Sequence, residues 1–332
     1  MGKENYKLYN GDCLEVFKNI KDKSVNLILI DPPYNIGKDK KWDKWKTVDA
    51  YVEFMGKVFL ECQRVLKDNG SFYFFHNDFL QIVELQNYIN NNTDFVFKQL
   101  LVWNKRFNKA SNKGFLDGFI EVEKLRNYQK MAEYCLYYTF QDETGLNKIL
   151  KQDGFLKLMN YFREERLKLG WNYKQCDDYL GIKASYCYWD KPTTHPYRIP
   201  DENHYLKLQK TGYFKRTYED LRQEYEDLRQ EYEDLRQEYE DLRYTFNNQK
   251  THHDVLDFEV AKKQGHITPK PVDLLEYIIK TSSNEGDIIL DCFMGSGSTG
   301  VACMNSNRKF IGIELDNNYF NIAKQRIEEA CK

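Results

Sequence analysis

The stretch that most constrains this chain is Asp31-Pro32-Pro33-Tyr34, which directly follows the apolar run of residues 25–30. The run is short and rich in β-branched side chains, as is typical of a fully buried strand in a parallel sheet. Two consecutive prolines fix φ and remove two N–H donors, so the chain must leave the sheet as a stiff, extended turn. The sequence therefore predicts an α/β sheet with a carboxylate at the carboxyl end of a strand, where open sheets of this class bind ligands.

These four residues bring three kinds of interacting group together. Asp31 offers a carboxylate, the turn offers backbone carbonyls, and Tyr34 offers an aromatic face. A flat ring that carries an amino group would match this cluster, because the amino group donates hydrogen bonds and the ring stacks. The alternative is a strand-ending aspartate in a proline turn, since Asp-Pro alone is common in loops.

A glycine-rich loop follows a second apolar strand near the other end of the sequence. The expected strand is residues 287–291, and the loop, residues 292–300, reads Cys-Phe-Met-Gly-Ser-Gly-Ser-Thr-Gly. Glycines let the backbone approach a ligand, and the N-terminus of the following helix favours an anionic group. Glu314 comes seventeen residues after Gly297, in the position of a ribose-binding acid. The loop predicts a cofactor with an adenosine part, either a dinucleotide or S-adenosylmethionine.

The order of the two motifs along the chain helps to decide between these two cofactors. Eighteen residues follow Glu314, enough for one helix but for no further strand. A complete sheet must therefore use N-terminal strands, which places Asp31 on the strand beside the glycine loop. Hydride transfer needs no amine-accepting cluster at that point, so methyl transfer to an amino group is the simpler interpretation.

Alternating strands and helices are expected on both sides of a more polar segment. The other expected strands are residues 6–9, 71–76, 95–103, 133–140 and 309–313, and the longer helices are residues 48–66, stopped by Asp68-Asn69-Gly70, and 79–89. The alternation predicts a doubly wound domain made of residues 1–140 and 258–332. Residues 141–257 would form an insert between its two parts.

The insert contains two patterns. Around residues 161–189, glycines at positions 170 and 181 would end two helices with the spacing of a helix-turn-helix, although a packed helical hairpin fits equally well. Residues 218–243 repeat Tyr-Glu-Asp-Leu-Arg-Gln-Glu and place tyrosine and leucine on one narrow face of a long helix. We expect this face to pack against another part of the protein or a second copy.

Charge is distributed unevenly along the chain. Removing the −7 of residues 218–243 from the formal net charge of −2 leaves +5 for the remainder. Much of the positive charge lies in two aromatic-rich stretches, residues 38–46 and 105–130, which would suit a polyanion with stackable bases. The candidate contacts are Lys38, Lys41, Lys105, Arg106, Lys109 and Lys113 in these stretches, and Arg163 and Lys174 in the helix-turn-helix-like segment.

The sequence disfavours a membrane protein, a metal-binding protein and a disulfide-bonded protein. No run approaches the roughly eighteen apolar residues of a membrane span, and the N-terminus has no apolar signal segment, so we expect a cytoplasmic protein without a membrane partner. The eight cysteines include no C-x-x-C pair, which predicts neither a metal site nor a disulfide framework.

Together the motifs resemble the amino-group DNA methyltransferases, which modify adenine N6 or cytosine N4. The catalytic motif comes first and the cofactor motif last, with an insert between, as in the group usually called β. Gly11-Asp12, residues 133–138 and residues 266–271 (His-Ile-Thr-Pro-Lys-Pro) also look like motifs of that family. The resemblance implies a doubly wound, mostly parallel sheet with a circularly permuted motif order, and S-adenosylmethionine as the cofactor.

The resemblance also assigns roles to residues. The catalytic residues would be Asp31, Pro32, Pro33 and Tyr34, and the cofactor-binding residues Asp12, Thr268, Asp291, Phe293, Gly295, Gly297, Ser298, Thr299 and Glu314. Asp31 and the Pro32 carbonyl would accept the amino hydrogens of a base turned out of duplex DNA, on which Tyr34 stacks. The insert would recognise the target sequence.

An aspartate at the first motif position favours adenine by resemblance, and N4 of cytosine stays open. A methyltransferase that acts on RNA or on a protein amide could use a similar cluster. A DNA-binding regulator without catalysis could keep the same cofactor fold. A homodimer and a cognate restriction endonuclease are further expected partners.

Overall fold

The computed structural model describes residues 5–37, 43–105, 131–141, 152–192, 196–247, 249, 253–261 and 269–332. The chain divides into two compact units, and each is described by itself. The larger unit comprises Met1–Gln141 and Arg243–Lys332, and the smaller one Asp142–Leu242.

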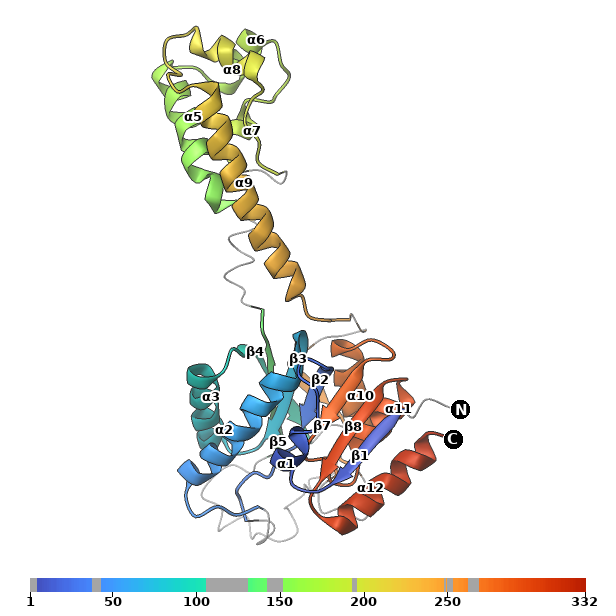
Figure 1. Ribbon diagram of the computed structural model, residues 1–332. Coiled ribbons are helices and arrows are strands. Elements are labelled where there is room, and N and C mark those ends of the chain that lie inside the picture. Colours follow the sequence, from blue (N-terminus) through green and yellow to red (C-terminus); the bar gives the residue numbers. More distant parts are fainter. Residues whose placement is uncertain are drawn as a thin grey trace. The chain divides into compact units, whose positions relative to one another are not determined.

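One eight-stranded sheet organises the described part of the larger unit (Figure 1). Its strands are β1 (Tyr6–Asn10), β2 (Val25–Ile30), β3 (Leu66–His76), β4 (Val96–Asn104), β5 (Ala132–Thr139), β6 (Val255–Asp257), β7 (Ile288–Asp291) and β8 (Lys309–Glu314). The spatial order is β1-β8-β7-β2-β3-β5-β4-β6. β5 is antiparallel to β3 and β4, and the other pairs are parallel. The predicted doubly wound, mostly parallel sheet is confirmed.

Helices cover both faces of this sheet (Figure 1). On one face lie α1 (Cys13–Phe17), α2 (Val48–Val65) and α3 (Phe79–Asn92), and on the other α10 (Val272–Ser282), α11 (Ser298–Asn305) and α12 (Asn317–Ala330). Side chains along β2 alternate between the two cores, with Ile28 and Ile30 in one and Leu27 and Leu29 in the other. This double burial explains why residues 27–30 of β2 are an uninterrupted apolar run.

The neighbouring positions of β2 and β7 create the site. Leu27 pairs with Ile289 and Ile28 with Leu290, in parallel. The carboxyl ends of both strands therefore lie at the same edge of the sheet, so the Asp31 turn and the glycine-rich loop emerge side by side.

Two features of the larger unit differ from the prediction. α2 ends at Val65 because Leu66 is already extended and pairs with Val25, so Asp68-Asn69-Gly70 lies within β3 and does not end the helix. β6 was not predicted, since three residues are too few to show a periodic pattern. β6 pairs with β4, and the compact insert ends at Leu242 instead of at residue 257.

The smaller unit is helical in its described residues. Its elements are η2 (Asp153–Phe155), α5 (Leu156–Lys168), α6 (Tyr173–Leu180), α7 (Cys187–Asp190), α8 (Glu202–Gln209) and α9 (Tyr218–Asp241). Gly170 and Gly181 both have positive φ just beyond the ends of α5 and α6, as expected for helix-stopping glycines. The Asp177 carboxylate accepts from the amides of Ser185 and Tyr186, which fixes the turn between α6 and α7.

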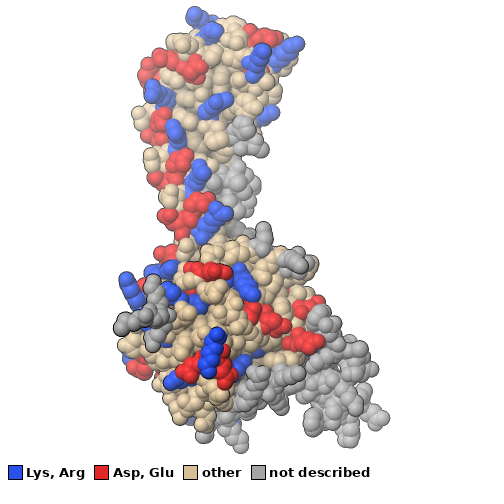
Figure 2. Space-filling view, turned by 90° about the vertical axis from the view of Figure 1, so that its right-hand side faces the viewer, with Lys and Arg blue, Asp and Glu red and all other residues tan. Residues whose placement is uncertain are grey.

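The heptad helix α9 packs through only part of its apolar face. Leu221 is fully buried, and Tyr225 and Tyr232 lie against the core of the smaller unit. Leu235, one heptad further than Leu228, is exposed. Acidic and basic side chains are interspersed on the face of this unit that Figure 2 shows.

No helix in the described part of the chain is long and apolar enough to cross a membrane. The described residues also contain no group of three or more side chains placed to hold a metal ion.

Candidate active site

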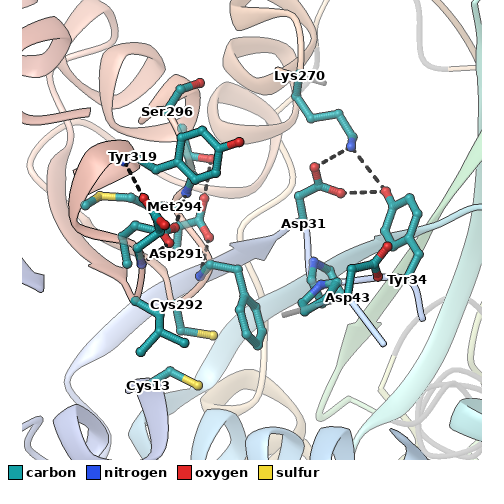
Figure 3. A pocket seen from close by; sticks show the side chains of 18 of the residues that line it. Cys13, Asp31, Tyr34, Asp43, Lys270, Asp291, Cys292, Met294, Ser296 and Tyr319 are labelled. Carbon is teal, nitrogen blue, oxygen red and sulfur yellow. Dashed lines mark hydrogen bonds and ion pairs between the residues drawn. The ribbon is translucent and has the colours of Figure 1, made fainter. Parts of the chain in front are cut away.

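A cavity of about 640 Å³ lies within the larger unit, where the Asp31 turn and the glycine-rich loop meet (Figure 3). This volume is within the range of roughly 300–1,000 Å³ common for small-molecule and cofactor sites. The expected site residues that line it are Asp12, Asp31, Pro32, Pro33, Tyr34, Asp291, Phe293, Gly295, Ser298, Thr299 and Glu314. Gly297 lies in the same loop, and Thr268 lies outside the described residues.

Both carboxylate oxygens of Asp31 are engaged by side chains. The Tyr34 hydroxyl donates to Oδ1 at 2.5 Å, and the Lys270 ammonium donates to Oδ2 at 2.5 Å. Lys270 also donates to the Tyr34 hydroxyl oxygen at 3.1 Å, which closes the triangle of contacts drawn in Figure 3. Because each carboxylate oxygen can accept two hydrogen bonds, Asp31 retains acceptor capacity for an amino group.

The turn after Asp31 is held by hydrogen bonds that its backbone carbonyls accept. Pro33 accepts from the Tyr51 hydroxyl at 2.7 Å, and Tyr34 accepts from the Gln81 amide at 3.2 Å. Among the described residues, no donor lies on the Pro32 carbonyl. Pro32 lines the cavity beside Asp31.

A neutral histidine supports the same turn from β3. The backbone N–H of Asp78 donates to Nδ1 of His76, so the ring proton belongs on Nε2, which lies 3.1 Å from the Tyr51 hydroxyl. Burial lowers the pKa of His76 to about 4, which keeps the ring neutral. The Tyr34 ring is also buried, and its centroid lies 4.8 Å from that of His76.

Sequence reasoning missed the roles of two charged residues near Asp31, Glu133 and Lys270. Glu133 of β5 is only 3% exposed, and its Oε2 lies 3.2 Å from the Lys270 ammonium. Lys105, expected to bind DNA, instead pairs with the other Glu133 oxygen and lies over the Trp103 ring. Burial alone would raise the pKa of Glu133, but the two lysines lower it to about 2. The signal for Glu133 and Lys270 was the match of residues 133–138 and 266–271 to family motifs, which gave no partner for either.

The glycine-rich loop is fixed by two carboxylates. Asp291 accepts from the Phe293 amide at 3.0 Å and from the Thr299 hydroxyl at 2.6 Å, and burial raises its pKa to about 7. Glu314 accepts from the amides of Gly295 and Asp316, both at 2.8 Å, and burial raises its pKa. Side chains expected to touch the cofactor therefore also hold the loop in shape.

Gly297 is required by geometry. Its φ is +80°, and a Cβ there would come within 2.9 Å of the Ala323 backbone on α12. The loop can therefore turn tightly into α11, whose first amides lack partners within the helix. Such an end favours an anionic group.

Most of the remaining DNA candidates lie outside the described residues, namely Lys38, Lys41, Arg106, Lys109 and Lys113. In the smaller unit, Arg163 donates to the Asp190 carbonyl at 2.6 Å, and Lys174 is exposed on α6.

Comparison with known proteins places this geometry in a family. The model of the DNA methylase family (N6_N4_Mtase) matches residues 25–325. The chain belongs to this family. The match spans both motifs and the insert, so it covers the catalytic turn and the glycine-rich loop together.

Individual relatives are similar over almost the full chain. DNA adenine methyltransferase YhdJ of Escherichia coli (strain K12) is 28% identical over 337 residues, covering 99% of this chain and 85% of the relative. Type II methyltransferase M1.MboII of Moraxella bovis is 26% identical over 321 residues, covering 96% and 94%. The solved structure of the M1.HpyAVI–SAM complex has the same fold, with a TM-score of 0.50 and 21% identity over 97% of this chain and 99% of that chain.

The enzyme is an S-adenosylmethionine-dependent DNA methyltransferase. The cavity suits this cofactor, because it combines hydrogen-bond acceptors for hydroxyl and ammonium groups with a helix N-terminus for a carboxylate. Asp12 and Glu314 would supply the acceptors, and the start of α11 at Ser298 would supply the amides.

Proposed function

We propose that this methyltransferase modifies the N6 amino group of an adenine turned out of duplex DNA, at a sequence chosen by the smaller unit. One observation carries the proposal. Asp31 and Pro32, whose carbonyl has no donor among the described residues, line the same cavity as the glycine-rich loop. Two acceptors on adjacent residues match the two hydrogens of an exocyclic amine.

These acceptors would act on the amine as it reacts. The lone pair of an exocyclic amine is delocalised into the ring, and two hydrogen bonds from its N–H groups favour the tetrahedral nitrogen of the transition state. When bound, S-adenosylmethionine supplies a methyl group on a sulfonium, whose sulfur keeps the electron pair of the bond that breaks. Asp31 then stands ready to receive the proton that the methylated nitrogen loses.

The preference for adenine rests on two supports. Aspartate at the first motif position resembles adenine-modifying members of the family, and the relative from Escherichia coli is named an adenine methyltransferase. N4 of cytosine is the second candidate, because it presents the same type of amino group.

The roles of the insert and the basic residues stay predictions. Sequence choice is assigned to the smaller unit, which has its own core and ends of helices held by Gly170 and Gly181. Phosphate contacts are assigned to the basic residues of 105–130, with Lys105 excepted because it pairs with Glu133. A second copy of the chain and a partner endonuclease remain expected from the resemblance.

The test is methyl transfer to defined substrates. Purified protein would be incubated with methyl-labelled S-adenosylmethionine and equal amounts of duplex DNA, structured RNA or protein. The proposal predicts label in duplex DNA alone, at a small set of sequences. Label in RNA or protein would indicate a different substrate class, and no label with cofactor bound would indicate a regulator without catalysis.

A further inference from the structure

We propose that Lys270 is a positioning residue for methyl transfer, a buried cation that orients the Asp31 carboxylate while Glu133 anchors the lysine. The inference rests on the proposed function, and it assigns a task to a side chain that contacts Asp31. Its basis is a chain of contacts that runs from β2 through the loop before α10 to β5 and β4.

The geometry holds the Lys270 ammonium from several sides. It lies 2.5 Å from Asp31 Oδ2 and 3.2 Å from Glu133 Oε2, so it bridges two carboxylates. It also lies 5.4 Å and 5.1 Å from the centroids of the Tyr34 and Phe75 rings, within the distance of cation–π contacts. Its side chain is only 6% exposed, which leaves it little room to turn away.

The charges of this cluster balance. Two carboxylates, Asp31 and Glu133, face two ammonium groups, Lys270 and Lys105. Burial alone would lower the pKa of Lys270, but the two carboxylates raise it above its ordinary value, so the lysine stays charged. A balanced set of charges can remain ionised in a buried place, whereas an unpaired member cannot.

Apart from Lys105, which pairs with Glu133, the titratable groups described on the other packed elements carry no positive charge. Burial raises the pKa of Tyr34, and that of Cys135 on β5, so both remain neutral. Burial likewise lowers the pKa of His76 on β3 and raises that of Tyr51 on α2.

Further carboxylates line the same cavity. Asp291 on β7 has a pKa raised to about 7 by burial, and Asp43 is almost fully buried. Neither could substitute for a cation, and each adds to the negative surroundings of Asp31 when it is ionised.

Removing the lysine charge should therefore leave the Asp31 carboxylate without one of its two side-chain partners. The ammonium that bridges Asp31 and Glu133 would be gone, so the two carboxylates would repel each other. An Asp31 carboxylate displaced from its position would accept the amino hydrogens poorly, and methyl transfer would slow.

The experiment compares wild type, K270M, the double variant K270M/E133Q and the surface control K57M. Lys57 pairs with Glu53 on the outside of α2, so its loss changes one lysine far from the cluster's contacts. Single-turnover methyl transfer to duplex DNA would be measured at saturating cofactor, with cofactor affinity and thermal unfolding alongside. K270Q, which is neutral but still donates a hydrogen bond, repeats the test should K270M not fold.

We expect K270M to lower the single-turnover rate at least about a hundredfold with cofactor affinity nearly unchanged, because a preorganised hydrogen-bonding group loses its position. E133Q in the same chain should restore at least about tenfold of the rate, because the opposing carboxylate is gone. A merely structural lysine would give no such rescue. K57M should match wild type.

The outcomes separate the two proposals. An active wild type whose K270M and K270Q variants keep the wild-type single-turnover rate would overturn this inference and leave the proposed function standing. The same holds if E133Q fails to rescue K270M. A folded wild type without methyl transfer to DNA would overturn the proposed function, and this inference with it.

Discussion

Asp31 has a separate partner on each carboxylate oxygen, the Tyr34 hydroxyl on one and the Lys270 ammonium on the other. These contacts keep the carboxylate in place before any substrate arrives. Its orientation therefore does not depend on the cofactor side of the cavity, where Asp291 and Glu314 hold the glycine-rich loop.

D31A should abolish methyl transfer while leaving cofactor affinity nearly unchanged. The carboxylate acts on the amine mainly in the transition state, where losing one preorganised hydrogen-bonding group costs at least about a hundredfold in rate. Single-turnover rate and calorimetric cofactor affinity would be measured on the same preparation. Near-normal turnover in D31A would remove Asp31 from the mechanism.

His76 should make stability fall on acidification. Its pKa is about 4 in the folded chain and about 6.5 when unfolded. As the pH drops from about 6.5 towards 4, the unfolded chain binds a proton that the folded chain does not, so folding weakens by on the order of 3 kcal/mol.

The difference between wild type and H76Q isolates this effect, because the buried carboxylates that titrate nearby are common to both. Thermal unfolding at pH 7, 6, 5 and 4 would follow it. We expect the wild type to lose stability relative to H76Q across this window. Parallel curves would mean that His76 is not held neutral.

At the scale of single residues, the sequence predicted the site residues at the ends of strands. It missed the side chains that reach the site from distant parts of the chain. Asp31, Asp291 and Glu314 follow or end apolar runs, and that pattern is local. Lys270 meets Glu133 only because the loop before α10 crosses to β5, and local patterns do not encode such a meeting.

Among the elements, the glycine-rich loop offers a direct test of backbone geometry. G297A should lower cofactor affinity at least about tenfold and destabilise the larger unit, because a Cβ meets the Ala323 backbone in addition to the strain of φ +80°. G286A is the matched control, since Gly286 has φ +83° but open space around it. It should cost about 1 kcal/mol with unchanged cofactor affinity. Equal binding losses in both variants would contradict the packing argument.

The repeats of α9 predict a difference between two deletions. Removing residues 225–231 deletes one whole repeat and keeps tyrosine and leucine in phase, so the core around Leu221 should survive. Removing residues 225–226 rotates the rest of the helix by roughly 200°. The tyrosine and leucine side chains that cover this core should then turn away from it, so the core becomes exposed. Thermal unfolding of the two proteins would be compared. Equal tolerance would mean that the face beyond Leu221 contributes no packing.

Long, strongly periodic elements were predictable, and short ones were not. α2, α9 and the buried strand β2 follow directly from periodicity or from an apolar run. β6 owes its existence to pairing with β4, and its three residues carry no pattern of their own. The end of the insert was misplaced for the same reason.

For the whole molecule, the order of motifs was the most informative feature of the sequence. The two motifs were expected on neighbouring strands of one sheet, and β2 does lie beside β7. The two motifs are more than 250 residues apart in the sequence and yet share one cavity. The residues that would carry the chemistry therefore all belong to the larger unit.

The most direct test of the central claim is the identity of the modified base. Duplex DNA of mixed sequence would be methylated by the wild-type protein, digested to nucleosides and analysed by mass spectrometry, with D31A as the matched control. The account predicts N6-methyladenine in the wild-type sample and none above background with D31A. N4-methylcytosine in its place, or equal methylation by D31A, would contradict it.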